Sequence, residues 1–240
     1  MKRLSILFAA LALSGTLTYA DEPVTDDDWQ FKLTPYVWLA GITGDTASDG
    51  VDLPPINPGY SFFSLENFDG VAFIDFTAEK GKWSAHSDLV FISFADTFPD
   101  GAVQSSFDFS GATLELSAGY QPASWQNTKL IFGARGVEVT MDVALNPGPS
   151  GSGSASFVDP IIGVQYQQTF ANKWGVAARG DIGSGSSELM FNAGLAGTYS
   201  FDDTFMLLFG YRYLKMEFED SDLLLDLSLQ GYSIGFQFAW

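Results

Sequence analysis

His86 is the single histidine of the 240-residue sequence, and Ser84 and Asp88 stand two residues before and after it. Serine, histidine and aspartate are the residues of acyl-transfer hydrolases, in which the imidazole takes the serine proton. Side chains two apart on one strand stand parallel and about 6–7 Å apart, which is poor geometry for a relay. A non-catalytic histidine facing a barrel interior is therefore the favoured interpretation. An outer-membrane lipid-modifying or hydrolytic enzyme using His86 is the alternative.

Metal and cofactor chemistry find little support in the sequence. With no cysteine and one histidine, thiolate and multi-histidine metal sites are excluded. Glu217, Glu219, Asp220 and Asp222 form an acidic group that could bind calcium or bridge lipopolysaccharide through divalent cations. A solvated acidic loop explains the same residues. We predict no metal and no cofactor.

Charge and composition exclude further classes of protein. The sequence holds 29 acidic and 11 basic residues, which gives a formal net charge of −18. A nucleic-acid-binding protein needs a basic face, so we predict no nucleic-acid partner. With 22 phenylalanines the chain is also unlike a disordered acidic segment.

The first residues resemble a secretory signal peptide. Lys2 and Arg3 precede an apolar run from Leu4 to Leu13, and a cleavage site with small residues follows, ending at Ala20. We predict a signal peptide over 1–20, an acidic lead-in over 21–28, and one domain over 29–240.

Alternation of apolar and polar residues dominates the rest of the chain and indicates β-strands. Ten such segments begin near Trp29, Gly70, Trp83, Ser106, Lys129, Phe157, Trp174, Leu189, Phe205 and Leu223. Short turns alternate with longer connections, of which we predict 41–69, 95–105 and the Gly/Ser-rich 144–155. The pattern predicts an all-β, antiparallel, transmembrane up-and-down barrel of about ten strands, with eight or twelve as alternatives.

Alternation alone also fits a soluble barrel, so a periplasmic soluble β-barrel binder is a further alternative. Two features favour the membrane. Glycines share the polar strand faces, as the crowded interior of a narrow barrel requires (Gly119, Gly133, Gly163, Gly175, Gly194 and Gly235). Aromatic residues also bracket the short turns, as in the girdles of membrane barrels.

The last strand carries its own signal. Tyr232, Phe236, Phe238 and Trp240 alternate to the end of the chain, which resembles the C-terminal assembly signal of bacterial outer-membrane proteins. The resemblance implies that the barrel-assembly machinery is a partner. Apolar residues occupy odd positions before Gln230 and even positions after Gly231, which predicts a β-bulge there. A similar shift follows Arg135, where the strand is expected to leave the bilayer.

Charged residues collect on the predicted interior face. They are Lys32, Asp75, Glu79, His86, Asp88, Glu115, Arg135, Asp159, Arg179, Asp181, Arg212 and Asp226. The favoured interpretation is an internal network in which the arginines pair with carboxylates and so make buried charge tolerable. The alternative is a narrow channel lined by these charges. Because seven acids face four bases, such a channel should prefer cations.

Several segments together resemble a widespread, mostly uncharacterised family of Gram-negative outer-membrane β-barrels. These segments are 33–39, 158–160 with Gly163, 174–183, and 210–213. One position departs from the expected pattern, because Gly136 follows Arg135 where a tyrosine is expected. The resemblance implies a small porin-like monomeric barrel in the bacterial outer membrane, in contact with its lipid and lipopolysaccharide. It implies no catalytic residue. We predict a structural protein or a narrow cation-preferring pore for small solutes, without catalysis.

Overall fold

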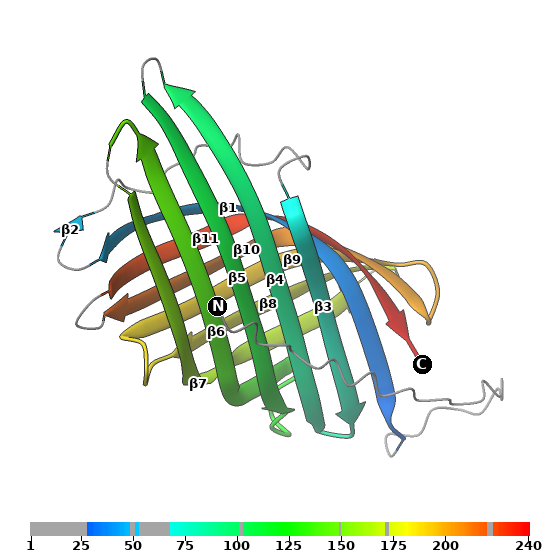
Figure 1. Ribbon diagram of the computed structural model, residues 1–240. Helices are drawn as coiled ribbons and strands as arrows, with labels where there is room; N and C mark the ends of the chain where they lie inside the picture. The colour runs from blue at the N-terminus through cyan, green and yellow to red at the C-terminus, as the bar shows by residue number, and fades with distance from the viewer. Residues whose placement is uncertain are drawn as a thin grey trace, which may run out of the picture.

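The computed structural model describes residues 28–48, 51–52, 68–100, 103–148, 150–170, 173–219 and 223–240, and these residues form a closed β-barrel (Figure 1). The strands are β1 (Gln30–Ser48), β2 (Val51–Asp52), β3 (Phe68–Lys80), β4 (Trp83–Asp100), β5 (Val103–Tyr120), β6 (Thr128–Asn146), β7 (Ser150–Phe170), β8 (Trp174–Gly183), β9 (Leu189–Ser200), β10 (Phe205–Glu219) and β11 (Leu223–Ala239). No helix among the described residues is long and apolar enough to cross a membrane.

Antiparallel pairing of each strand with the next, from β3 to β11, builds the wall of the barrel. Strand β1 pairs with β3 on one side and with β11 on the other, and this second pairing closes the sheet. The two-residue β2 pairs only with β1. Ten strands therefore make the barrel, as the sequence predicts. The first connection is shorter than the predicted 41–69, because β1 continues to Ser48 and β3 begins at Phe68.

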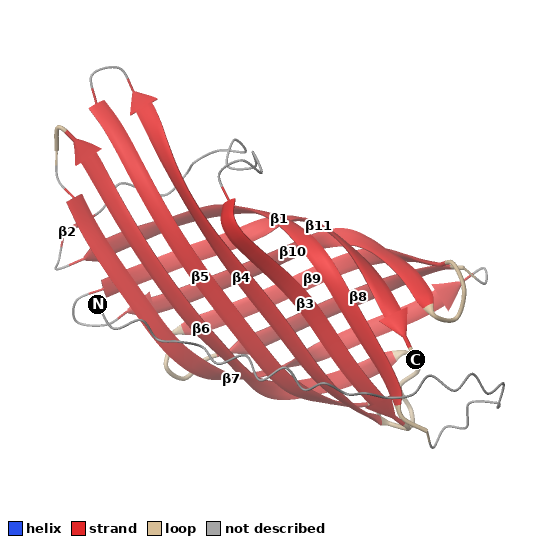
Figure 2. Cartoon of the chain, turned by 45° about the vertical axis from the view of Figure 1, so that its right-hand side comes forward, coloured by secondary structure: helices blue, strands red, loops and turns tan. Residues whose placement is uncertain are grey.

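The two ends of the barrel differ. At one end, here called the turn end, the connections are residues 81–82, 121–127, 171–173 and 201–204. Strand β11 finishes at this end, where Trp240 and Phe31 exchange backbone hydrogen bonds of 2.9 and 3.0 Å. At the opposite end, here called the loop end, the β4–β5 and β6–β7 hairpins project beyond the other strands (Figure 2).

These projecting hairpins correct two predicted loops. Most of 95–105 and of 144–155 is strand, and only residues 101–102 and 147–149 lie between the strands. The Ser/Gly segment from Ser150 pairs with β6, with Ser152 opposite Asp142. Serine and glycine alternate strictly in this segment, which is the two-residue period of a β-strand. The period therefore indicates its structure correctly, and the loop-like composition does not.

The outer face of the barrel is apolar. Large hydrophobic side chains with more than a third of their surface exposed lie on every barrel strand, among them Leu39, Ile74, Leu116, Phe132, Ile162, Ile182, Leu195, Phe209 and Ile234. Trp29, Trp83, Trp125, Phe170, Trp174, Phe201, Phe205 and Trp240 add an exposed aromatic rim at the turn end. A water-soluble barrel needs a polar outer face, so this surface argues against the soluble alternative and matches a membrane barrel.

The predicted β-bulge at Gln230–Gly231 is wrong. The pairing of β11 with β1 runs without a shift through Leu39↔Tyr232 and Gly41↔Gln230. Leu227 and Leu229 are buried in the interior on the same face as Gly231. The chain does not change face. The interior itself changes from apolar to polar along the barrel axis.

The inward face of strand β6 also changes from polar to apolar along the barrel axis. Val137, Val139 and Met141 are buried in the interior together with Arg135, and the β6–β7 register is continuous. The predicted departure of this strand from the bilayer after Arg135 stays a prediction, since the outward-facing Glu138, Thr140 and Asp142 beyond this point are polar and exposed.

Interior glycines have two different uses. At Gly133 and Gly163 an added Cβ would lie within 2.2 Å of a backbone oxygen of the neighbouring strand, so the close approach of strands requires glycine. At Gly194 the nearest atom to an added Cβ is 3.8 Å away. This glycine leaves interior space unfilled.

The predicted signal peptide over 1–20 and all but the last residue of the 21–28 lead-in lie outside the described residues. Most of the predicted connection 41–69 does so too, from 53 to 67.

Candidate functional site

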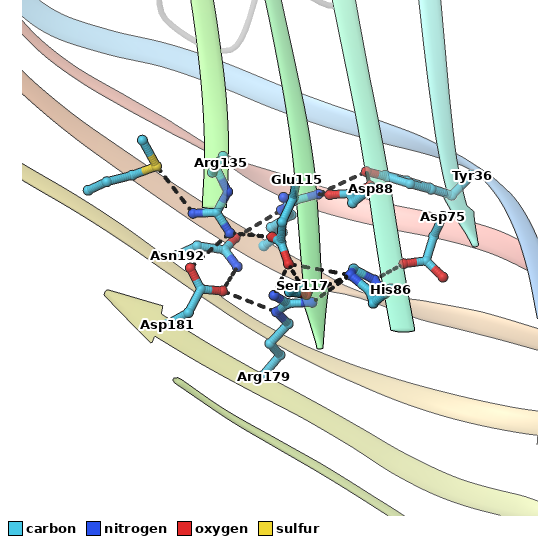
Figure 3. A network of polar contacts seen from close by, with 12 residues as sticks. Tyr36, Asp75, His86, Asp88, Glu115, Ser117, Arg135, Arg179, Asp181 and Asn192 are labelled. Carbon is cyan, nitrogen blue, oxygen red and sulfur yellow. Dashed lines mark hydrogen bonds and ion pairs between the residues drawn. The ribbon is translucent and has the colours of Figure 1, made fainter. Parts of the chain in front are cut away.

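A layer of polar side chains crosses the barrel interior on the side of the turn end. We call it the interior polar layer, and define it as Tyr36, Asp75, His86, Asp88, Glu115, Ser117, Arg135, Arg179, Asp181, Asn192 and Arg212 (Figure 3). Eight of the barrel strands, β1, β3, β4, β5, β6, β8, β9 and β10, contribute to it. Side chains from opposite walls therefore meet across the lumen.

Glu115 on β5 is the centre of the layer. Its Oε2 accepts a hydrogen bond of 2.6 Å from Nη2 of Arg135, and its Oε1 accepts from Nη2 of Arg179. Ser117 donates a further 2.8 Å bond to Oε1. The side chains of Glu115 and Arg135 are only 2% and 1% exposed. A carboxylate buried this deeply is tolerable because two guanidiniums satisfy both of its oxygens.

Asp181 on β8 links the two guanidiniums a second time. Its Oδ2 accepts from Nε of Arg179 at 3.1 Å and from Nδ2 of Asn192 at 2.7 Å. Its Oδ1 lies 2.8 Å from Nη2 of Arg135 as an ion pair, without a hydrogen bond of its own. Arg135, Arg179, Glu115 and Asp181 thus form a closed ring of alternating charge.

Arg212 on β10 extends the layer to the far wall. Its Nε donates to the Asn192 amide oxygen at 3.0 Å, and its Nη1 lies 2.9 Å from Oδ2 of Asp88 and donates to the Tyr36 hydroxyl at 2.8 Å. Tyr36 donates in turn to Oδ1 of Asp88 at 2.7 Å. The guanidinium also lies 4.9 Å from the ring centre of Trp38, and this cation–π contact covers one face of the guanidinium.

His86 on β4 stands between carboxylates and a serine from neighbouring strands. Its Nε2 hydrogen-bonds Asp75 on β3, and its Nδ1 lies 3.4 Å from Oγ of Ser117 on β5 and 3.2 Å from Nη1 of Arg179. An aspartate, a histidine and a serine therefore do converge, although the serine is Ser117 and not the Ser84 singled out in the sequence.

This constellation lacks the features of a hydrolase. The hydroxyl of Ser117 donates to Glu115 and not to the imidazole, and Ser117 is absent from the residues that line the adjoining cavity. A nucleophile must reach its substrate, and this hydroxyl is buried. The Asp75–His86–Ser117 arrangement therefore fits the hydrogen-bond network better than it fits catalysis.

The charges of the layer nearly cancel. Asp75, Asp88, Glu115 and Asp181 oppose Arg135, Arg179 and Arg212, so a protonated His86 makes the layer neutral. Below it, toward the turn end, Nζ of Lys32 and Nζ of Lys129 bind the two oxygens of Glu79 at 2.9 and 2.7 Å.

Four residues of the predicted set lie outside the layer: Lys32 and Glu79 below it, and Asp159 and Asp226 farther away. Asp159 faces the interior of β7 but binds the connection between β8 and β9, accepting from the backbone nitrogens of Ser186 and Ser187 at 2.6 and 3.0 Å. Asp226 was expected in the lumen. The structure places it on the outer face with Lys215 and Glu217, because the neighbouring Leu227 points inward.

Above the polar layer, toward the loop end, the interior is filled by hydrophobic side chains. We call this the apolar layer: Trp38, Phe73, Val90, Ile92, Phe109, Val137, Val139, Met141, Ala155, Phe157, Met190, Leu214, Met216, Leu227 and Leu229. Met190 and Leu227 are completely buried and Leu214 is 1% exposed. Met190 joins the two layers, since its sulfur accepts a 3.3 Å contact from Nη1 of Arg135.

Below the polar layer the barrel holds a cavity of about 240 Å³. His86, Asp88, Arg179 and Arg212 line its inner end. A second cavity of about 480 Å³ shares Lys32, Glu79, Gln165 and Gln167 with the first, and also touches Gln121 and Asn127 in the turn after β5. The two cavities therefore form one vestibule that opens at the turn end.

Within the described residues, no group of three or more histidine, cysteine, aspartate or glutamate side chains is arranged to hold a metal ion. The residues of the predicted assembly signal lie on the outer face of β11, where Tyr232, Phe236 and Phe238 are exposed. Trp240 stacks on Phe31 with ring centres 5.8 Å apart.

Sequence reasoning missed the uncharged members of the layer. Tyr36 and Ser117 add hydrogen bonds to ion pairs, and Asn192 connects Asp181 with Arg212, but nothing in the sequence distinguishes them from other polar residues on the same strand faces. The strand register could have found Ser117, which lies directly opposite His86.

Similarity to known proteins is found among solved structures. No family model and no curated protein matches the sequence. The outer-membrane protease OmpT of Escherichia coli superimposes with a TM-score of 0.56 at 8% sequence identity, over 92% of this chain and 99% of that one. Ail, the attachment invasion locus protein of Yersinia pestis, aligns with a TM-score of 0.40 at 11% identity over 88% and 99%. Neisserial surface protein A aligns with 0.35 at 12% over 90% and 99%. The superposition on OmpT thus shows the fold of an outer-membrane β-barrel.

Proposed function

We propose that this chain is an integral outer-membrane protein with a closed lumen, a structural barrel without catalysis. Its placement in the membrane is supported by the apolar outer face, which has no use in water, and by the aromatic rim at the turn end. In bilayer hydrocarbon every backbone polar group must be paired, and the closure of β1 on β11 meets that demand.

The two stacked interior layers are the observation that supports a closed lumen. Ion pairs join strands from different sides of the barrel in the polar layer, and above it Met190, Leu214 and Leu227 leave almost no accessible surface. A water-filled channel needs a continuous polar path, and fully buried hydrophobic side chains interrupt it. A narrow cation-preferring pore would require both layers to open.

The orientation follows from the general plan of such barrels. Short turns face the periplasm and longer segments face the outside. The projecting β4–β5 and β6–β7 hairpins then lie outside the cell, and the vestibule opens to the periplasm. Membrane lipid and lipopolysaccharide contact the outer face, the barrel-assembly machinery inserts the chain, and the barrel works as a monomer.

The absence of catalysis is the second part of the proposal. Its support is the burial of Ser117 and the pairing of its hydroxyl with Glu115. OmpT shares the fold but is 8% identical, so its protease activity carries no weight here.

Planar-bilayer recordings on purified protein test the closed lumen. We expect no step conductance above the level given by detergent alone. The matched control is a known open porin inserted by the same procedure. Cation-selective steps from this protein, abolished by heat denaturation, would contradict the closed barrel and establish the narrow pore. The placement is tested independently, because a membrane barrel co-sediments with outer membranes and migrates differently on gels when unheated.

A further inference from the structure

The vestibule below the polar layer is a cavity lined by side chains of the barrel strands. The two interior layers close its inner end, and toward the turn end it continues into the second cavity, which reaches Gln121 and Asn127. The inner cavity of about 240 Å³ corresponds to on the order of eight water molecules. This is the size class of a single small polar solute.

Small residues create this space. Strands β8 and β9 place Ala177, Gly194 and Ala196 along the cavity wall. Gly194 is the clearest case, since an added Cβ would find its nearest neighbour, a backbone oxygen of Tyr211, at 3.8 Å. Strand packing does not require glycine here, in contrast to Gly133 and Gly163.

The charged groups around the cavity already satisfy one another. Lys32 pairs with Glu79. His86 pairs with Asp75, Arg179 with Glu115 and Arg212 with Asp88. A charged solute would have to break one of these pairs, which is strongly unfavourable for partly buried ions.

The unsatisfied hydrogen-bonding groups are all neutral. The side chains of Gln165 and Gln167 on β7 and of Gln237 on β11 line the cavity without a hydrogen-bond partner among the described residues. The hydroxyls of Thr34 and Ser233 join them. Amides and hydroxyls from facing walls offer both donors and acceptors, which is the complement of a neutral, hydroxyl- or amide-bearing molecule.

We propose that this cavity binds a small uncharged solute rich in hydroxyl or amide groups, of the size of one sugar unit, entering from the turn end. The inference goes beyond the structural role proposed above. The statement that the solute enters from the periplasm rests on the orientation proposed above. The binding itself does not rest on it, because purified barrels in detergent expose the vestibule whether or not they conduct ions.

Titration calorimetry with refolded protein in detergent tests the site, with N-acetylglucosamine as the probe. We expect saturable binding that weakens by about tenfold or more in Gly194→Leu, which fills the cavity, and in Gln167→Leu, which removes an amide. Glucosamine and glucuronate, which carry a charge, should bind at least about tenfold more weakly than the neutral probe.

Matched variants on the outer face separate binding from folding. At Gly180 an added Cβ meets no atom within 4 Å, and this residue lies outward on β8, so Gly180→Leu makes the same change outside the cavity. Gln230→Leu on the outer face of β11 is the control for the lost amide. Both should bind like the parent protein. Absence of saturable binding, equal binding by the charged sugars, or equal losses in inner and outer variants would each overturn the proposal, provided that the variants keep the gel shift of a folded barrel.

Discussion

The two layers of the interior occupy the same strand faces but close the lumen by opposite means. On β6, Arg135 belongs to the polar layer and Val137 and Val139 to the apolar one, and on β10 Arg212 is followed by Leu214 and Met216 in the same way. Paired ions join specific atoms across the lumen, whereas hydrophobic side chains fill volume. The difference teaches that the interior of a membrane barrel is not uniformly polar, and that inward-facing positions have to be assigned by register and not by polarity.

Breaking the polar layer at its centre should have the largest effect. Glu115→Ala leaves Arg135, which is 1% exposed, and Arg179 without one of the two carboxylates that they share. Removing one partner of a buried ion pair costs about 3–5 kcal/mol. We expect a loss of that size in the free energy of unfolding, measured by urea denaturation in lipid vesicles.

Glu138→Ala is the control for this experiment. Glu138 lies on β6 with its side chain exposed on the outer face, so its loss should change stability little. If the two substitutions had equal effects, the polar layer would not hold the walls together.

Breaking the apolar layer should cost somewhat less. Leu214→Ala removes a side chain that is 1% exposed and leaves a cavity among Met190, Met216 and their neighbours. Large-to-small substitutions in packed interiors cost about 2–5 kcal/mol. The same unfolding measurement applies, with Leu195→Ala as the comparison, because Leu195 is 61% exposed on the outer face and leaves no interior cavity. Equal losses at the two leucines would indicate that the apolar layer is loosely packed.

The sequence predicts the wall of this barrel better than its contents. Period-two alternation located all ten barrel strands, because strand position depends on a local pattern that reads along the chain. The β7 start at Ser150 was missed, since Ser and Gly carry little hydrophobic contrast. The interior charges were found from the same alternation, including Arg135, Arg179 and Arg212.

What could not be predicted is which of these groups touch. Contacts such as that between Arg212 and Tyr36, which are 176 residues apart, depend on the closure of the barrel and on the relative shift of its strands. Asp226 was misplaced for a related reason: its leucine neighbours were assumed to face lipid, and the interior at that depth is apolar.

The smallest effect should come from the ion pairs on the outer face. Lys215 binds Glu217 and lies 3.6 Å from Asp226 on the outer face, where all three side chains are more than a quarter exposed. Exposed ion pairs contribute about 0–1 kcal/mol and are screened by salt. We expect Lys215→Ala to lower the free energy of unfolding by less than about 1 kcal/mol, and high salt to abolish the difference. The Glu115→Ala effect should persist in salt, because its partners are buried. A large loss in the free energy of unfolding from Lys215→Ala that salt does not reduce would contradict this distinction between the interior network and the surface. It would also contradict the argument that burial makes the ion pairs of the polar layer strong.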